Sequence, residues 1–248
     1  MSFNQTQLSN AERIRERFER RSRIPFSGLL TNKLLTALSG PDFTQLLPFL
    51  EPVTFRTGEY IYELGQEYSY IYFPETVVIT QLCYLEDGSS TGVAIVGNDG
   101  LLGLSAVLGS QYAQFWTLAT IGGSALRIRV DDLRQEFLKG GGLHTLILAH
   151  ANDRMTQLSQ RTVCNSRHRL EERLCTWLLM IHDRATDSDL PLTHETISQQ
   201  LGTRRAGVTN LCNVLRDHGI IAYHRAKITI LNRAELEKSA CECYRRTK

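Results

Sequence analysis

Hydrophobic positions along the chain change their spacing, and the first change separates a helical start from a β-rich region. Over residues 29–50, leucines and Phe43 recur at helical intervals, and Ser39-Gly40-Pro41 interrupts them. This pattern predicts two short helices. From Val53 onward, short runs of apolar and β-branched residues alternate with glycine- and proline-containing turns. Many short strands at such spacing predict an antiparallel sandwich or barrel.

Helical spacing returns after the three glycines at 140–142. One helical pattern covers Leu143 to about Arg161, and another covers Cys164 to Asp183. The apolar side of the first pattern is broken by polar residues. We therefore expect a long helix that leads out of the β-rich region, followed by a second helix that packs inside a core.

Residues 192–231 predict two short helices that meet at a glycine. Thr193 is a good N-cap for the first helix, and Gly202 allows a tight turn. The second helix is expected to begin near Thr203. Its predicted buried stripe consists of Val208, Leu211, Cys212 and Leu215.

The opposite face of this second helix carries small or hydrogen-bonding side chains. They are Arg205, Ala206, Thr209, Asn210 and Asn213, and no carboxylate follows until Asp217. Such a face suits a helix that enters the major groove of DNA and touches base edges.

A β-hairpin is predicted after Gly219. Residues 220–223 and 227–231 are the two strands, and residues 224–227 form a basic tip that could clamp a phosphate. Together with the two helices this is a winged helix-turn-helix. The competing interpretation is a helical hairpin with a small sheet that serves packing alone.

Charge is distributed unevenly over the 248 residues. The net charge is +2, but residues 163–248 carry 14 Lys and Arg against 10 Asp and Glu, whereas residues 1–162 carry 14 against 16. A basic C-terminal part on a mildly acidic body fits a nucleic-acid-binding protein with a separate sensing or dimerising part. The sequence has no stretch of transmembrane length and no apolar leader, so we expect a cytoplasmic protein without a membrane partner.

The order of these elements resembles the Crp–Fnr family of bacterial transcription regulators. The residues 192–221, LTHETISQQLGTRRAGVTNLCNVLRDHGII, match the family helix-turn-helix, and residues 46–109 are similar to the cyclic-nucleotide-binding-like fold. The resemblance implies an α+β protein with a β-barrel (jelly roll), a long connecting dimerisation helix and a C-terminal winged helix-turn-helix. It also implies a homodimer on an inverted repeat of double-stranded DNA, with RNA polymerase as a further partner.

The predicted domains follow from these patterns and from the resemblance. They are an N-terminal extension (1–28), the sensor barrel (29–142), the connecting helix (143–162), the winged helix-turn-helix (163–238) and a C-terminal tail (239–248). The predicted DNA-binding residues are Thr193, Thr203, Arg204, Arg205, Ala206, Thr209, Asn210, Asn213, Arg225 and Lys227. By resemblance, the base-contacting positions are Arg205, Ala206 and Asn210. The family often has Arg, Glu and Arg there, so the half-site sequence is expected to differ.

The barrel is predicted to be a degenerate ligand pocket. Family members that bind cyclic nucleotides have a Gly-Glu pair and a nearby arginine, whereas this chain has Gly103, Leu104 and Ser105. From Thr57 to Leu126 there is no Lys, Arg or His, and seven carboxylates are present. A buried phosphate would lack a cationic partner, so we expect cyclic-nucleotide binding to be lost. Arg127 and Arg129, just beyond, are the remaining candidates for such a partner.

No metal or other cofactor is expected. All seven His lie at or beyond His144, the barrel contains one Cys, and the six Cys of the chain form no CxxC pair. The pair Cys241 and Cys243 is too sparse for a metal site by itself. No nucleophile–base arrangement indicates an enzyme. The alternative function is a regulatory subunit that acts on a protein partner without binding DNA.

Overall fold

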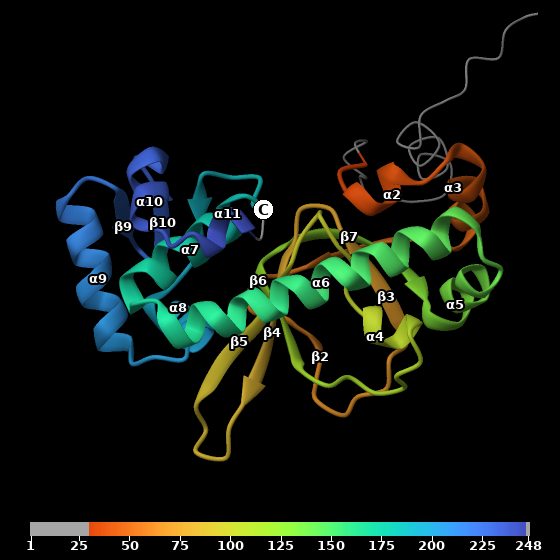
Figure 1. Cartoon of the computed structure of the whole chain (residues 1–248), viewed down its shortest axis with the longest axis horizontal. Coiled ribbons are helices and arrows are strands. Elements are labelled where there is room, and N and C mark those ends of the chain that lie inside the picture. Colours follow the sequence, from red (N-terminus) through yellow and green to blue (C-terminus); the bar gives the residue numbers. More distant parts are fainter. Residues whose placement is uncertain (1–29, 247–248) are drawn as a thin grey trace, which may run out of the picture.

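The computed structural model describes residues 30–246 and contains two domains joined by a long helix (Figure 1). The chain starts with helices α2 (Lys33–Ala37) and α3 (Gly40–Leu46) and the short 3-10 helix η1 (Leu47–Phe49). Asn32 and Ser39 cap the two α-helices with their side chains, which satisfies backbone N–H groups at the first turn. The expected pair of short helices is confirmed. The predicted extension of residues 1–28 lies outside the described residues.

Seven strands build the first domain, called the β domain here. They are β1 (Glu51–Phe55), β2 (Tyr60–Tyr62), β3 (Tyr70–Pro74), β4 (Val78–Tyr84), β5 (Ser90–Val96), β6 (Trp116–Ile121) and β7 (Gly123–Arg129). All pairs are antiparallel, in two sheets of order β1-β7-β3 and β2-β6-β4-β5. This arrangement is jelly-roll-like, as predicted, with two sheets in place of one closed barrel.

The helices around the β domain were predicted only in part. Helix α4 (Leu104–Val107) follows Gly103, and α5 (Val130–Leu138), which the sequence patterns did not predict, continues directly from β7. Helix α6 (Gly141–Arg167) is longer than predicted at both ends, and α7 (Leu170–His182) begins later than the predicted Cys164. The break falls at His168 and Arg169, so residues 163–167 belong to the connecting helix.

The C-terminal domain contains α7, β8 (Asp189–Leu190), α8 (His194–Leu201), α9 (Arg205–Asp217), β9 (Ile221–His224) and β10 (Lys227–Ile230). Helices α10 (Arg233–Ser239) and α11 (Cys243–Arg246) complete it, and α11 packs on α6 and α7. The sheet order is β8-β10-β9. Residues 239–246, predicted as a tail, are therefore part of the folded body.

The two domains are in direct contact. Val78 and Ile95 of the β domain belong to the hydrophobic core that Trp177 and Ile197 form in the C-terminal domain. Gln200 donates a hydrogen bond from Nε2 to Thr80 Oγ1 at 2.8 Å, and both side chains are buried. No helix within residues 30–246 is long and apolar enough to cross a lipid bilayer.

Candidate nucleic-acid interface

Local chemistry explains the helix-turn-helix. Thr193 caps α8 by accepting a hydrogen bond from Thr196 N at 2.9 Å, and Gly202 ends that helix with φ 59°. A side chain at position 202 would be strained by this left-handed backbone and would also approach Thr91 Oγ1 to 2.9 Å. Both sequence signals, the cap and the turn glycine, are confirmed.

Helix α9 presents the predicted polar face to solvent. It begins at Arg205, two residues after the predicted start, and buries Val208, Cys212 and Leu215. The exposed side chains at its N-terminal end are Arg204, Arg205, Ala206 and Asn210. The first turn contains no acidic residue, and no side chain caps it. Backbone N–H groups and two guanidinium groups therefore face outward together, which favours an anionic partner.

Thr209 and Asn213 lie at the margin of this face, and Thr209 has a structural partner. Its Oγ1 is 3.0 Å from His194 Nδ1, and the His194 ring stacks on Tyr223 of β9 with ring centroids 4.2 Å apart. Burial and the neighbouring Arg205 guanidinium lower the pKa of His194. His194 thus joins α8, α9 and the hairpin, a role that helical periodicity did not reveal. Thr193 and Thr203 are half-buried beside the same face.

The hairpin forms the predicted wing with a strained tip. Its two-residue turn places Arg225 at φ 47° and Ala226 at φ 62°, although neither residue is glycine. Such a turn matches the twist of paired strands but normally uses Asn or Gly. Arg225 is exposed, and Lys227 Nζ lies 3.9 Å from Asp189 Oδ2. Of the two predicted wing cations, Lys227 is therefore the one with a nearby carboxylate.

The three residues of the predicted degenerate pocket, Gly103, Leu104 and Ser105, lie against side chains of the β domain. Gly103 has φ 94°, and a Cβ there would lie 2.7 Å from Ile71 Cδ1. Leu104 packs against the core of the β domain, and Ser105 Oγ donates to Tyr68 Oη at 3.1 Å. None of these three residues offers a charge to a phosphate.

Aromatic rings fill the interior beside this segment. Tyr62 lies edge-on to Tyr68 and Tyr72, with ring centroids 4.9 and 5.9 Å away. Burial raises the pKa of Tyr62 and Tyr72, so both phenols are neutral. Arg127 forms an ion pair with Glu51 at 3.0 Å and lies over the Tyr70 ring, and Arg129 is exposed.

The exposed basic face, the turn and the wing define a winged helix-turn-helix DNA-binding protein with an N-terminal β domain. The profile of the Crp-like helix-turn-helix domain matches residues 172–239. This match shows that the C-terminal domain is a Crp-like helix-turn-helix domain. Over most of its length the chain is similar to DNA-binding transcription regulators of the Crp–Fnr type.

Known proteins are similar to this chain over about three quarters of its length. The global nitrogen regulator of Synechococcus elongatus is 23% identical over 193 residues, which cover 74% of this chain and 87% of that protein. FixK2 from Bradyrhizobium japonicum superposes with a TM-score of 0.66 at 19% identity, covering 77% of this chain and 98% of FixK2. A CRP-family transcriptional regulator from Thermus thermophilus gives a TM-score of 0.63 at 20% identity, over 76% of this chain and 96% of that one. These structural likenesses show the fold.

Proposed function

We propose that this protein regulates transcription by binding an inverted-repeat DNA site as a homodimer, with a β domain that no longer binds cyclic nucleotides. The observation that carries the proposal is the N-terminal end of α9, where Arg204, Arg205 and Asn210 are exposed without an acidic neighbour in the first turn. Arg205 can hydrogen-bond a guanine edge with two N–H groups, and Asn210 can do so with an adenine. Arg204 and the wing residue Arg225, both exposed, would contact phosphates.

Dimerisation through α6 is supported by its exposed apolar side chains. Leu148, Met155, Leu158 and Val163 are 44%, 67%, 40% and 49% exposed. Leu148 and Met155 are two turns apart on one side of the helix, where a second copy would cover them. A two-fold axis along α6 would set two α9 helices about one DNA turn, ~34 Å, apart. Such a dimer bound near a promoter would present a surface to RNA polymerase.

The DNA-binding assignment is tested with a site selected from genomic fragments and measured by electrophoretic mobility shift. Arg205→Ala should weaken binding by about 1–3 kcal/mol if the guanidinium reads a base. Arg216→Ala is the matched control, because Arg216 is exposed on the same helix but pairs with Asp217 at the other end. Equal affinity for both variants, or no DNA bound by the wild type, would favour the alternative of a regulatory subunit acting on a protein.

The dimer is tested by light scattering of the full chain. Charges introduced by Leu148→Glu with Met155→Glu should produce a monomer and weaken binding to a palindromic site far more than to a half-site. Leu138→Glu is the control, because Leu138 is 75% exposed but lies on α5 and not on α6. A wild-type monomer on and off DNA would contradict the proposed assembly.

A further inference from the structure

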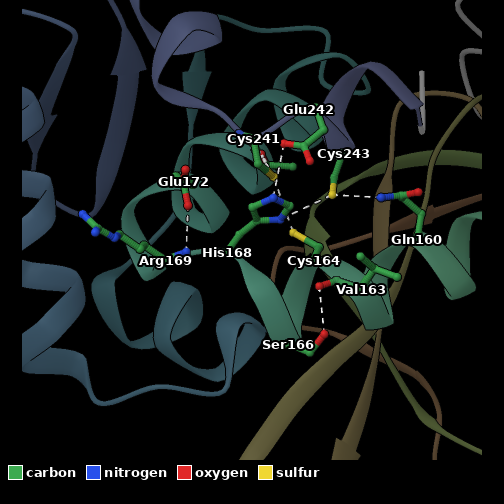
Figure 2. A network of polar contacts seen from close by, with 11 residues as sticks. Gln160, Val163, Cys164, Ser166, His168, Arg169, Glu172, Cys241, Glu242 and Cys243 are labelled. Carbon is green, nitrogen blue, oxygen red and sulfur yellow. Dashed lines mark hydrogen bonds and ion pairs between the residues drawn. The ribbon is translucent and has the colours of Figure 1, made fainter.

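A cluster of three cysteines and one histidine lies where α6 ends. Cys164 and His168 are four residues apart at the end of α6, and Cys241 and Cys243 follow α10 (Figure 2). Their ligand atoms all lie within 4.8 Å of one another. The three cysteines are buried, and the His168 side chain is 14% exposed. Residues about 75 positions apart in the sequence thus meet around one point.

The spacing of the four ligand atoms matches a single tetrahedral metal ion. Cys164 Sγ lies 3.5 Å from Cys241 Sγ, and His168 Nδ1 lies 3.5 Å from Cys243 Sγ. In a tetrahedral zinc site, bonds of about 2.3 Å to sulfur and about 2.0 Å to nitrogen put the ligand atoms roughly 3.5–3.8 Å apart. An iron–sulfur cluster holds its ligands around several atoms, so it would not fit between groups this close.

Surrounding side chains hold the four ligands in position. Glu242 Oε2 lies 3.2 Å from His168 Nε2, which leaves Nδ1 facing the cysteines (Figure 2). A carboxylate on the far nitrogen is the usual device that orients a metal-binding histidine. Gln160 donates from Nε2 to Cys243 Sγ at 3.0 Å, and Thr176 Oγ1 lies 3.1 Å from Cys241 Sγ. Both partners can donate a hydrogen bond to a thiolate.

We propose that Cys164, His168, Cys241 and Cys243 bind one Zn²⁺ ion in a closed, structural site. Four protein ligands leave no coordination position for substrate or water, so the ion would stabilise the fold and would have no catalytic role. On binding, the three thiols release their protons to solvent and coordinate as thiolates. The sequence predicts no metal because the cysteines form no CxxC pair and Cys241 and Cys243 are too sparse by themselves, whereas the fold adds Cys164 of α6 and its C-cap His168.

The position of the proposed site suggests that a bound ion would link α6 to the C-terminal domain. Cys164 lies in the connecting helix and His168 caps its end. Cys241 bonds to Thr176 of α7, and Cys243 starts α11. Zinc would therefore fasten the end of α6 to the last segment of the C-terminal domain. Loss of the ion should loosen the DNA-binding domain relative to α6 without altering the β domain.

The site is tested on the full chain, expressed with zinc in the medium and purified without chelators or a metal-affinity tag. Elemental mass spectrometry should find near-stoichiometric zinc that survives dialysis. Cys243→Ser should lose it, and Cys83→Ser should keep it, because Cys83 lies on β4 outside the cluster. Glu242→Gln retains all four ligands and should weaken zinc retention against a competing chelator by about 10–100-fold.

A second measurement does not depend on the folding of a variant. Wild-type protein stripped of metal and titrated with Co²⁺ should show the intense visible bands of tetrahedral cobalt and a thiolate-to-cobalt charge-transfer band. Sub-stoichiometric zinc together with no cobalt–thiolate band would overturn the proposal. So would a Cys164–Cys241 disulfide in freshly isolated protein, since the same two sulfurs cannot both be oxidised and bind the ion.

Discussion

The outer face of α9 and the interior of the β domain use polar side chains in opposite ways. On α9, Arg204, Arg205 and Asn210 extend into solvent. In the β domain, Tyr62 Oη donates to Tyr70 O at 2.8 Å and accepts from Tyr70 N at 2.9 Å, so its hydrogen-bonding capacity is used within the fold. The first region offers its polar groups to a partner, and the second has satisfied them internally.

This difference indicates where a signal could act on the protein. A ligand inside the β domain would have to displace packed tyrosine rings, which is costly in a close-packed interior. The junction between the domains, by contrast, contains buried charge. Arg184 donates from Nε to Asp99 Oδ1 at 3.1 Å, and Arg154 donates to Ile95 O at 2.9 Å. The largest effects of substitution are therefore expected at the junction.

The largest predicted effect is that of Asp99→Asn. Burial alone would raise the pKa of Asp99, but the Arg184 guanidinium and its hydrogen bonds outweigh burial and lower that pKa. Removing this carboxylate leaves the Arg184 side chain, 7% exposed, without its counter-charge, at a cost of about 3–5 kcal/mol. Urea unfolding followed by circular dichroism measures the loss.

The control for this prediction is an exposed ion pair in the β domain. Glu51, 57% exposed, pairs with Arg127, and Glu51→Gln should cost about 0–1 kcal/mol because solvent screens the charges. Equal losses in the two variants would remove the contrast between a buried junction and an exposed surface.

The second prediction concerns acid sensitivity at His150, which packs from α6 against Gly100 of the β domain. Burial, followed by the nearby Arg154, lowers the pKa of His150 from 6.5 to about 4. Below pH 6.5 the unfolded chain binds a proton that the folded chain does not, so stability falls as the pH drops toward 4. The full loss is about 3 kcal/mol. In His150→Leu, the melting temperature should depend less steeply on pH between 6.5 and 4 than in the wild type. His218→Leu, a change at an exposed position, should keep the wild-type dependence.

The helix-turn-helix could be predicted from sequence because its determinants are local. Thr193, Gly202 and the predicted stripe each act within a few residues, and the structure confirms the cap and the turn. Of the stripe, Val208, Cys212 and Leu215 are buried and Leu211 is partly buried against the same core. The role of His194 could not be predicted, since its contacts to Thr209 and Tyr223 depend on how two helices and a hairpin pack. Periodicity placed Thr209 outward, although its hydroxyl faces His194.

The cysteine–histidine cluster could not be predicted from the sequence either, because its ligands are far apart along the chain and meet only through tertiary packing. Cys164 lies 77 residues before Cys241, and each pair alone has no metal-binding pattern. Only the packing of α11 against α6 brings them together. The absence of Lys, Arg and His from Thr57 to Leu126, in contrast, is a property of composition, so it follows from the sequence alone.

The third prediction is a gain of stability at the wing. Ala226 has φ 62°, a left-handed conformation that costs an L-residue about 1–2 kcal/mol and costs glycine little. Ala226→Gly should therefore stabilise the protein by up to about 1 kcal/mol, while DNA affinity stays unchanged because the methyl group carries no contact chemistry. Ala222→Gly, in strand β9, should instead destabilise by about 0.5–1 kcal/mol. Destabilisation by both variants would show that the turn is not strained in solution.

The last prediction is that cyclic nucleotides leave the stability of the protein unchanged. It bears directly on the difference between the β domain and α9. Cyclic AMP and cyclic GMP should not change the melting temperature of the full chain, because Leu104 packs against the core and Arg127 is paired with Glu51. A ligand present at about 100 times its Kd would stabilise the native state by about 2.7 kcal/mol, which corresponds to a rise of roughly 5–10 °C in the melting temperature of a protein of this size. A specific DNA site should produce such a shift, and it serves as the positive control in the same instrument.

Leu104→Glu should not restore binding either, since a carboxylate without an arginine adds repulsion to the phosphate. A melting shift with either cyclic nucleotide at micromolar concentration would mean that the tyrosine-filled interior opens, and the contrast with α9 would then fail.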